Sequence, residues 1–102
     1  MANQTFEWKK ANVTVAKIEI SHLKFEMILN VRNEVADKVR AKMAELNDCG
    51  TYPNEETTKA GGLASQFIIS SPYNWNCRWR DFLTIINRLL DITAVELTEP
   101  QR

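Results

Sequence analysis

The sequence feature that most constrains the fold is an apolar stripe with helical spacing in the last third of the chain. Its members recur at intervals of three or four residues: Trp75, Trp79, Phe82, Leu83, Ile86, Leu89 and Leu90. Residues spaced in this way share one face of an α-helix, and so wide an apolar face must be covered by another layer of the protein. The stripe therefore predicts a helix over residues 75–90. We expect Trp79, Phe82 and Ile86, in its middle, to be almost fully buried.

Short strands are predicted on both sides of this helix. Residues 66–70 hold three apolar side chains in a row, which is typical of a strand covered on both faces. Asn74 and Asn76 are candidate N-caps for the helix, and residues 92–98 indicate a last strand. If both strands belong to one sheet, the helix between them forms a right-handed parallel crossover.

The first part of the chain predicts up to three further strands. Residues 13–20 are rich in β-branched side chains, and residues 23–29 alternate between apolar and charged side chains. The apolar side chains of the second segment share one face of a half-buried strand: Leu23, Phe25, Met27 and Leu29. A tight turn at Ser21 and His22 would join the two segments, and a short strand is expected earlier, around residues 6–8.

The hydrophobic period changes after Asn30. From Val31 to Leu46 apolar residues recur every three or four positions, which predicts a first helix with Asn30 as its N-cap. One long helix over residues 21–46 is the alternative interpretation. The strict alternation of residues 23–29 argues against it.

Residues 47–62 form the one clear break in composition. The segment is rich in glycine, proline and polar side chains and is nearly free of apolar ones. It predicts a long polar surface loop, in which Glu55 and Glu56 are solvated and Gly61 and Gly62 form a flexible hinge. Loops of this length are often functional, and the sequence leaves open whether this one is.

Together these elements predict a single α+β domain over residues 1–102. The length of 102 residues suits one domain, and 44% hydrophobic and 25% charged residues are ordinary proportions for a globular protein. We expect a two-layer sandwich with a mixed sheet of four to five strands and two helices on one face, in the order β(β)βαβαβ.

The chemistry-bearing residues argue against an enzyme. His22 is the only histidine, and it lies at a predicted turn with no nucleophile or carboxylate cluster beside it. Its spacing from Cys49 and Cys77 matches no metal-ligand pattern, so we expect no catalytic residue, no metal and no cofactor. Two cysteines are too few for a disulfide scaffold, and residues 1–5 show no signal-peptide pattern. We therefore expect a cytoplasmic protein with reduced thiols and no membrane contact.

Residues 73–80 are the most unusual stretch, because aromatic side chains, arginines and asparagines are interleaved within it. Both tryptophans of the stretch belong to the apolar stripe, which leaves Tyr73, Arg78 and Arg80 as candidate partner-binding residues. Tyrosine and arginine are enriched at the centres of protein interfaces, and they also suit base stacking and phosphate contacts. A purely structural role at the start of the helix is the third interpretation.

The charge balance disfavours a nucleic-acid or membrane partner. Thirteen basic and thirteen acidic residues give a formal net charge of zero, so no overall field steers the protein toward an anionic surface. No stretch matches the motif of a known family. The size, the neutral charge and the lack of catalytic groups are similar in general style to small virus- or plasmid-encoded accessory and inhibitor proteins.

We therefore expect a non-enzymatic binding protein, monomeric or homodimeric, that acts by occupying a surface of another macromolecule. Another protein is the expected partner. The alternative is a nucleic-acid-binding module that uses Tyr73, Arg78 and Arg80.

Overall fold

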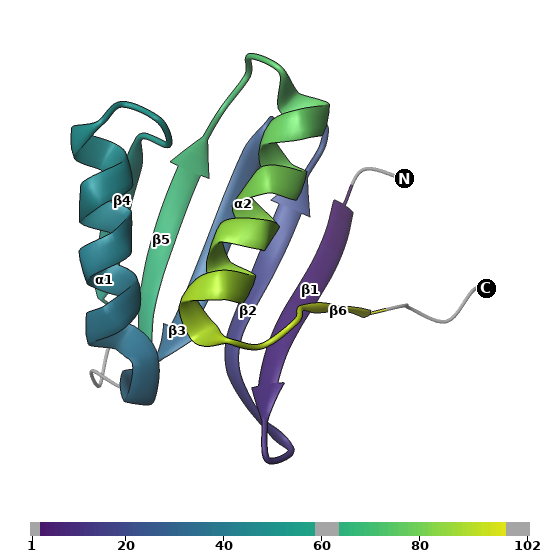
Figure 1. Ribbon diagram of the computed structural model, residues 1–102. Helices are drawn as coiled ribbons and strands as arrows, with labels where there is room; N and C mark the ends of the chain where they lie inside the picture. The colour runs from purple at the N-terminus through teal and green to yellow at the C-terminus, as the bar shows by residue number, and fades with distance from the viewer. Residues whose placement is uncertain (1–2, 59–63, 98–102) are drawn as a thin grey trace.

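Two helices pack on one face of an antiparallel sheet in the computed structural model, which describes residues 3–58 and 64–97 (Figure 1). The strands are β1 (Asn3–Lys10), β2 (Val13–Ser21), β3 (Glu26–Arg32), β4 (Asn54–Thr58), β5 (Ala64–Ser70) and β6 (Val95–Leu97). The helices are α1 (Asn33–Asp48) and α2 (Trp75–Leu90). The sheet order is β4-β5-β3-β2-β1-β6, with α1 over the β4–β5 side and α2 over the middle. The α+β class and the two helices are as predicted.

The sheet differs from the prediction in strand count and in direction. It has six strands within the described residues, where four to five were expected, and every neighbouring pair is antiparallel rather than mixed. The additional strand is β4, which lies inside the segment predicted as a polar loop. Because β4 is an edge strand with only one neighbour, it forms without apolar side chains of its own. The predicted hinge at Gly61 and Gly62 lies outside the described residues.

The connection from β5 through α2 to β6 crosses the sheet. Because each neighbouring pair is antiparallel, β5 and β6 point in the same direction, as the predicted crossover requires. The two strands are not neighbours, however, since β3, β2 and β1 lie between them. The last strand is also shorter than predicted, and it pairs with β1 at the far edge of the sheet.

The hairpin between β2 and β3 is longer than predicted. Its turn occupies residues 22–25, so Leu23 and Phe25 lie outside the strand and are 78% and 42% exposed. The burial expected for these two side chains is therefore wrong, whereas Met27 and Leu29 are fully buried as expected. The strand alternation continues to the buried Val31, one of the residues assigned to the first helix from its sequence.

The extension of β3 moves the start of α1. Asn30 is not an N-cap but a strand residue, opposite Gln66 of β5, whose Nε2 donates a hydrogen bond to Asn30 Oδ1 at 3.0 Å. The helix begins instead at Asn33, and the residue before it, Arg32, makes no side-chain capping bond. The helix does end close to the predicted residue, at Asp48.

The apolar stripe of α2 forms the centre of the core, as predicted. Phe82 and Ile86 are 0% exposed and Trp79 is 8% exposed, and the helix bounds match the expected ones. These three side chains share one core with buried side chains of the sheet and of α1: Trp8, Val15, Ile18, Ile20, Met27, Leu29, Val31, Val39, Met43, Phe67 and Ile69. In β5 only alternate residues are buried, so this strand is covered on one face and not on both.

Candidate interaction surface

The three residues that the sequence singled out differ in burial and in contacts. Tyr73 lies in the connection between β5 and α2, and its side chain is 83% exposed. Arg80 is exposed in the second turn of α2, where its guanidinium carbon lies 5.1 Å from the centre of the Trp79 ring. Arg78 is half-buried, and its guanidinium contacts the segment that follows α1.

Arg78 forms several contacts within the fold. Its Nη2 donates to the backbone carbonyl of Thr51 at 2.6 Å, and its Nε donates to Ser71 Oγ at 3.2 Å. The guanidinium also lies over the ring of Tyr52, 4.7 Å from its centre, while the Tyr52 hydroxyl donates to the Arg78 carbonyl. These contacts tie the start of α2 to two other segments. The guanidinium of Arg78 is therefore engaged within the fold. Tyr73 and Arg80 are the more exposed residues of the predicted group.

Burial of Tyr52 makes the stability of the protein sensitive to alkaline pH. Burial raises the pKa of the Tyr52 hydroxyl above its ordinary value of 10.0, and the nearby charge of Arg78 only partly opposes this shift. Because the folded-state pKa is raised, the contribution to stability is fully present below about pH 10 and is lost as the pH rises further.

We expect a Tyr52→Phe variant to lose less stability than the wild type between about pH 9 and 11, since phenylalanine has no proton to release. The measurement is the free energy of urea unfolding across this range. All other side chains are the same in the two proteins, so their effects cancel in the difference. Parallel curves for the two proteins would contradict a buried, protonated Tyr52.

A shallow hollow lies at the end of the domain where the β2–β3 turn meets the start of α2. It has a volume of about 480 Å³ and is lined by His22, Phe25, Asn74, Trp75, Asn76 and Cys77. The Trp75 ring meets Phe25 and His22 edge to face, with ring centres 5.7 Å and 5.8 Å apart. The backbone N–H of Ser71 donates to the Phe25 carbonyl at 3.1 Å, so the two connections are joined directly.

Two residues beside the hollow adopt left-handed backbone conformations. Phe25 has φ of 55° and Asn74 has φ of 53°. Such values are uncommon for residues other than glycine, particularly for a bulky one such as phenylalanine. Of the two candidate N-caps, Asn74 occupies the N-cap position of α2 and Asn76 lies inside the helix, but the Asn74 side chain makes no capping hydrogen bond. Contacts between side chains must therefore hold the first turn of this helix in place.

Exposed apolar side chains lie on the two connections that meet at the hollow. The described residues include five large apolar side chains that are exposed: Val13, Leu23, Phe25, Tyr73 and Val95. Three of them, Leu23, Phe25 and Tyr73, belong to the two joined connections. The sequence analysis missed Leu23 and Phe25, because their alternation with charged residues continued the pattern of the following strand. The exposed cations nearest in the chain are Lys24 and Arg80, and neither forms an ion pair with a described residue.

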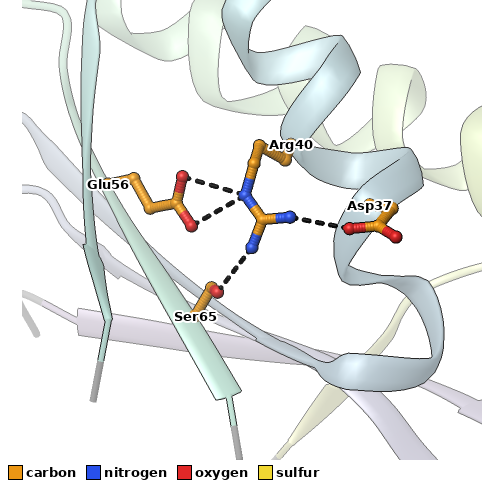
Figure 2. A network of polar contacts seen from close by, with 4 residues as sticks. All are labelled: Asp37, Arg40, Glu56 and Ser65. Atoms are coloured by element: carbon orange, nitrogen blue, oxygen red, sulfur yellow. Dashed lines mark hydrogen bonds and ion pairs between the residues drawn. The ribbon is translucent and has the colours of Figure 1, made fainter. Parts of the chain in front are cut away.

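A second polar cluster, around Arg40, joins α1 to the sheet. Figure 2 shows the Arg40 guanidinium between Asp37 on its own helix, Glu56 of β4 and Ser65 of β5, at 2.8, 2.9 and 3.1 Å. The hydrogen bond and the charge of Glu56 raise the pKa of Arg40 above its ordinary value. Glu56 was expected to be solvated in a loop, but it holds the edge strand against α1 and its side chain is 28% exposed. This cluster positions β4, and its groups are already paired with one another.

The ligand-type side chains do not converge within residues 3–58 and 64–97. His22 and Cys77 line the same hollow, but no group of three histidine, cysteine or acidic side chains there is placed to hold a metal ion. Both cysteines are exposed free thiols. Neither described helix is long and apolar enough to cross a membrane.

No protein-family model, curated protein or solved structure matches this chain. What the protein does is therefore inferred from its own side chains.

Proposed function

We propose that the protein is a non-enzymatic binding protein, and that it contacts a partner protein through the end of the domain described above. The contact surface, here called the turn-end surface, consists of Leu23, Lys24, Phe25, Tyr73 and Arg80. The observation that carries the proposal is that Leu23, Phe25 and Tyr73 are exposed on two connections that are hydrogen-bonded to each other. Such a binding protein acts by occupying a surface of its partner, as an inhibitor or an accessory protein does.

The physical argument concerns what exposed apolar side chains gain from a partner. Clustered exposure of large apolar side chains is unusual on a monomer and marks interaction sites. Tyr73 supplies a large ring with few rotatable bonds, so it loses little entropy when it is buried at an interface. The buried Trp75 ring packs edge to face against Phe25 and so anchors this side chain of the surface to the core.

The charges on this surface favour an acidic partner protein. Lys24 and Arg80 are exposed, and Arg80 is held over the Trp79 ring rather than by a carboxylate. Positive groups at the margin of an interface increase the rate of association with a negatively charged partner.

A nucleic-acid partner is the second candidate, favoured by the combination of an exposed tyrosine with Lys24 and Arg80. The sheet face opposite the helices argues against a long nucleic-acid track. It presents Glu19 and Glu26 beside Lys17 and Arg32, so it lacks the continuous basic stripe that phosphates require.

We expect removal of the exposed apolar side chains to abolish partner capture without unfolding the protein. The test variant is Leu23→Ser/Tyr73→Ser, and the matched control is Val13→Ser/Val95→Ser, which removes two exposed apolar side chains elsewhere. Each protein is used as bait in extracts of the source cells, and captured proteins are identified by mass spectrometry. A partner bound by wild type and control but lost by the test variant supports the proposal.

Affinity measurements then distinguish the two kinds of partner. Loss of Tyr73 is expected to weaken protein binding by about 1–3 kcal/mol if this residue is a hot spot. A steep fall of affinity with salt, in proportion to the phosphates contacted, would indicate nucleic acid instead. Equal capture by test and control variants would place the interface elsewhere on the molecule.

A further inference from the structure

Beside the turn-end surface, four side chains from four different elements form a continuous chain of hydrogen bonds. Trp75 of α2 donates its Nε1–H to His22 Nδ1 at 2.8 Å. His22 Nε2 lies 2.7 Å from Gln4 Oε1 of β1, and Gln4 Nε2 donates to Glu96 Oε2 of β6 at 3.0 Å. The start of α2 is thereby linked through the β2–β3 turn to both strands at one edge of the sheet.

The chemistry of the two end groups fixes every hydrogen bond in this chain. An indole N–H can only donate, and an ionised carboxylate can only accept. Gln4 must therefore present its amide nitrogen to Glu96 and its oxygen to His22. It follows that His22 carries its proton on Nε2 and keeps a free lone pair on Nδ1 for Trp75. Only the neutral imidazole, in this one tautomer, satisfies both neighbours.

Addition of a proton to His22 is incompatible with this arrangement. The new proton would occupy Nδ1, where it would point at the Trp75 N–H, so that two donors would face each other. Among the described residues, the other charged or titratable groups linked to this site are Lys24 in the same turn, Cys77 in the hollow, Arg80 over the Trp79 ring that His22 also contacts, and Glu96 at the end of the hydrogen-bond chain. None of these side chains is hydrogen-bonded to Nδ1 in place of Trp75.

This bond holds Trp75 in the first turn of α2, where Arg78 makes the contacts to Thr51 and Ser71 described above. Asn74 provides no side-chain cap, and Trp75 is held by His22 and by edge-to-face contacts with His22 and Phe25. Trp75 is also the residue that supports Phe25 on the turn-end surface. Loss of its hydrogen bond therefore loosens the base of that surface.

We propose that His22 is a proton-operated latch: neutral His22 holds Trp75 and assembles the turn-end surface, and uptake of a proton releases Trp75. The release of Trp75 is a property of the fold alone. Its consequence, weaker partner binding in mild acid, rests on the proposed function.

The test follows the indole N–H signals of the intact, ¹⁵N-labelled protein by nuclear magnetic resonance from about pH 8 to 5. As the His22 ring signals show proton uptake, the Trp75 signal is expected to move and its exchange with solvent to accelerate roughly 10-fold, as for loss of one hydrogen bond. Trp8 is an internal control, because its Nε1–H donates to Asn87 Oδ1, a group that does not titrate.

A His22→Gln variant provides the matched control, since glutamine has a hydrogen-bonding side chain without a titrating group. In this variant the Trp75 signal is expected to stay constant across the same pH range. A wild-type Trp75 signal that stays constant while His22 takes up a proton would overturn the latch. A His22 that remains neutral down to pH 5 would overturn it as well.

Binding measurements separate the latch from the proposed function. If the latch regulates the surface, wild type binds the captured partner several-fold more weakly at about pH 5.5 than at pH 7.5, and the His22→Gln variant does not. Release of Trp75 with an unchanged affinity would overturn the regulatory step and leave the contact surface standing. Full binding by the Leu23→Ser/Tyr73→Ser variant would overturn the contact surface and leave the latch standing.

Discussion

Replacement of Phe82 by alanine is expected to destabilise the protein by ~3–5 kcal/mol, a large part of the stability of a domain of this size. The Phe82 side chain is 0% exposed and lies in the middle of α2, and its ring centre is 5.3 Å from that of Tyr52. Truncation removes buried apolar surface and leaves a cavity between the helix and the segment after α1. Urea unfolding of the two proteins measures the difference.

Thr84→Ala is the control for this prediction, because Thr84 is exposed on the same helix. The control is expected to change the free energy of unfolding by no more than about 0.5 kcal/mol. A Phe82→Ala protein that unfolds at the same urea concentration as wild type would show that the stripe of α2 is not the centre of the core.

The second large effect is expected from Arg78, which the sequence alone presented as a surface residue like Arg80. Arg78→Ala removes two hydrogen bonds from a charged donor, and we expect it to cost roughly 2 kcal/mol. Arg80→Ala removes an exposed side chain with no hydrogen bond to a described residue, and we expect a change within about 0.5 kcal/mol. Thermal and urea unfolding of both variants provide the comparison.

An Arg78→Lys variant examines the geometry of this contact. Lysine keeps the charge but lacks the planar fork that reaches Thr51 and Ser71 together, so we expect it to restore only part of the lost stability. Equal stability of the Arg78→Ala and Arg80→Ala variants would mean that the contacts of Arg78 contribute nothing measurable.

The parts of the fold that were predicted from the sequence are those whose apolar residues are spaced regularly within one segment. The stripe of α2 requires only local spacing, and its bounds and its buried residues followed directly. The start of α1 could not be predicted from local spacing, because Val31 fits the alternation of the strand as well as the spacing of the helix. The pairing of β3 with β5 decides between the two, and that pairing is not visible in either segment alone.

The remaining features depend on contacts between distant residues. β4 has no apolar pattern, and it exists because β5 offers a hydrogen-bonding edge and Arg40 offers a partner for Glu56. The role of Arg78 depends on Thr51, which lies 27 positions away in the chain. The single histidine was correctly placed at a turn, but its hydrogen bonds come from α2 and β1, and no sequence spacing indicates them.

The pairing of the first strand with the last has a consequence for biosynthesis. Thr5 is opposite Leu97, and Gln4 reaches Glu96 across 92 positions of the chain. During synthesis, the edge of β1 that pairs with β6 therefore has no partner strand until residues 95–97 have been made. Contacts this distant in the chain form slowly, because a long loop must close before they contribute. During that interval, strands of other chains can pair with the unpaired edge of β1. Once the three-residue β6 has formed, it covers Thr5, Phe6 and Glu7 of that edge, so this part of β1 no longer offers free backbone hydrogen-bonding groups.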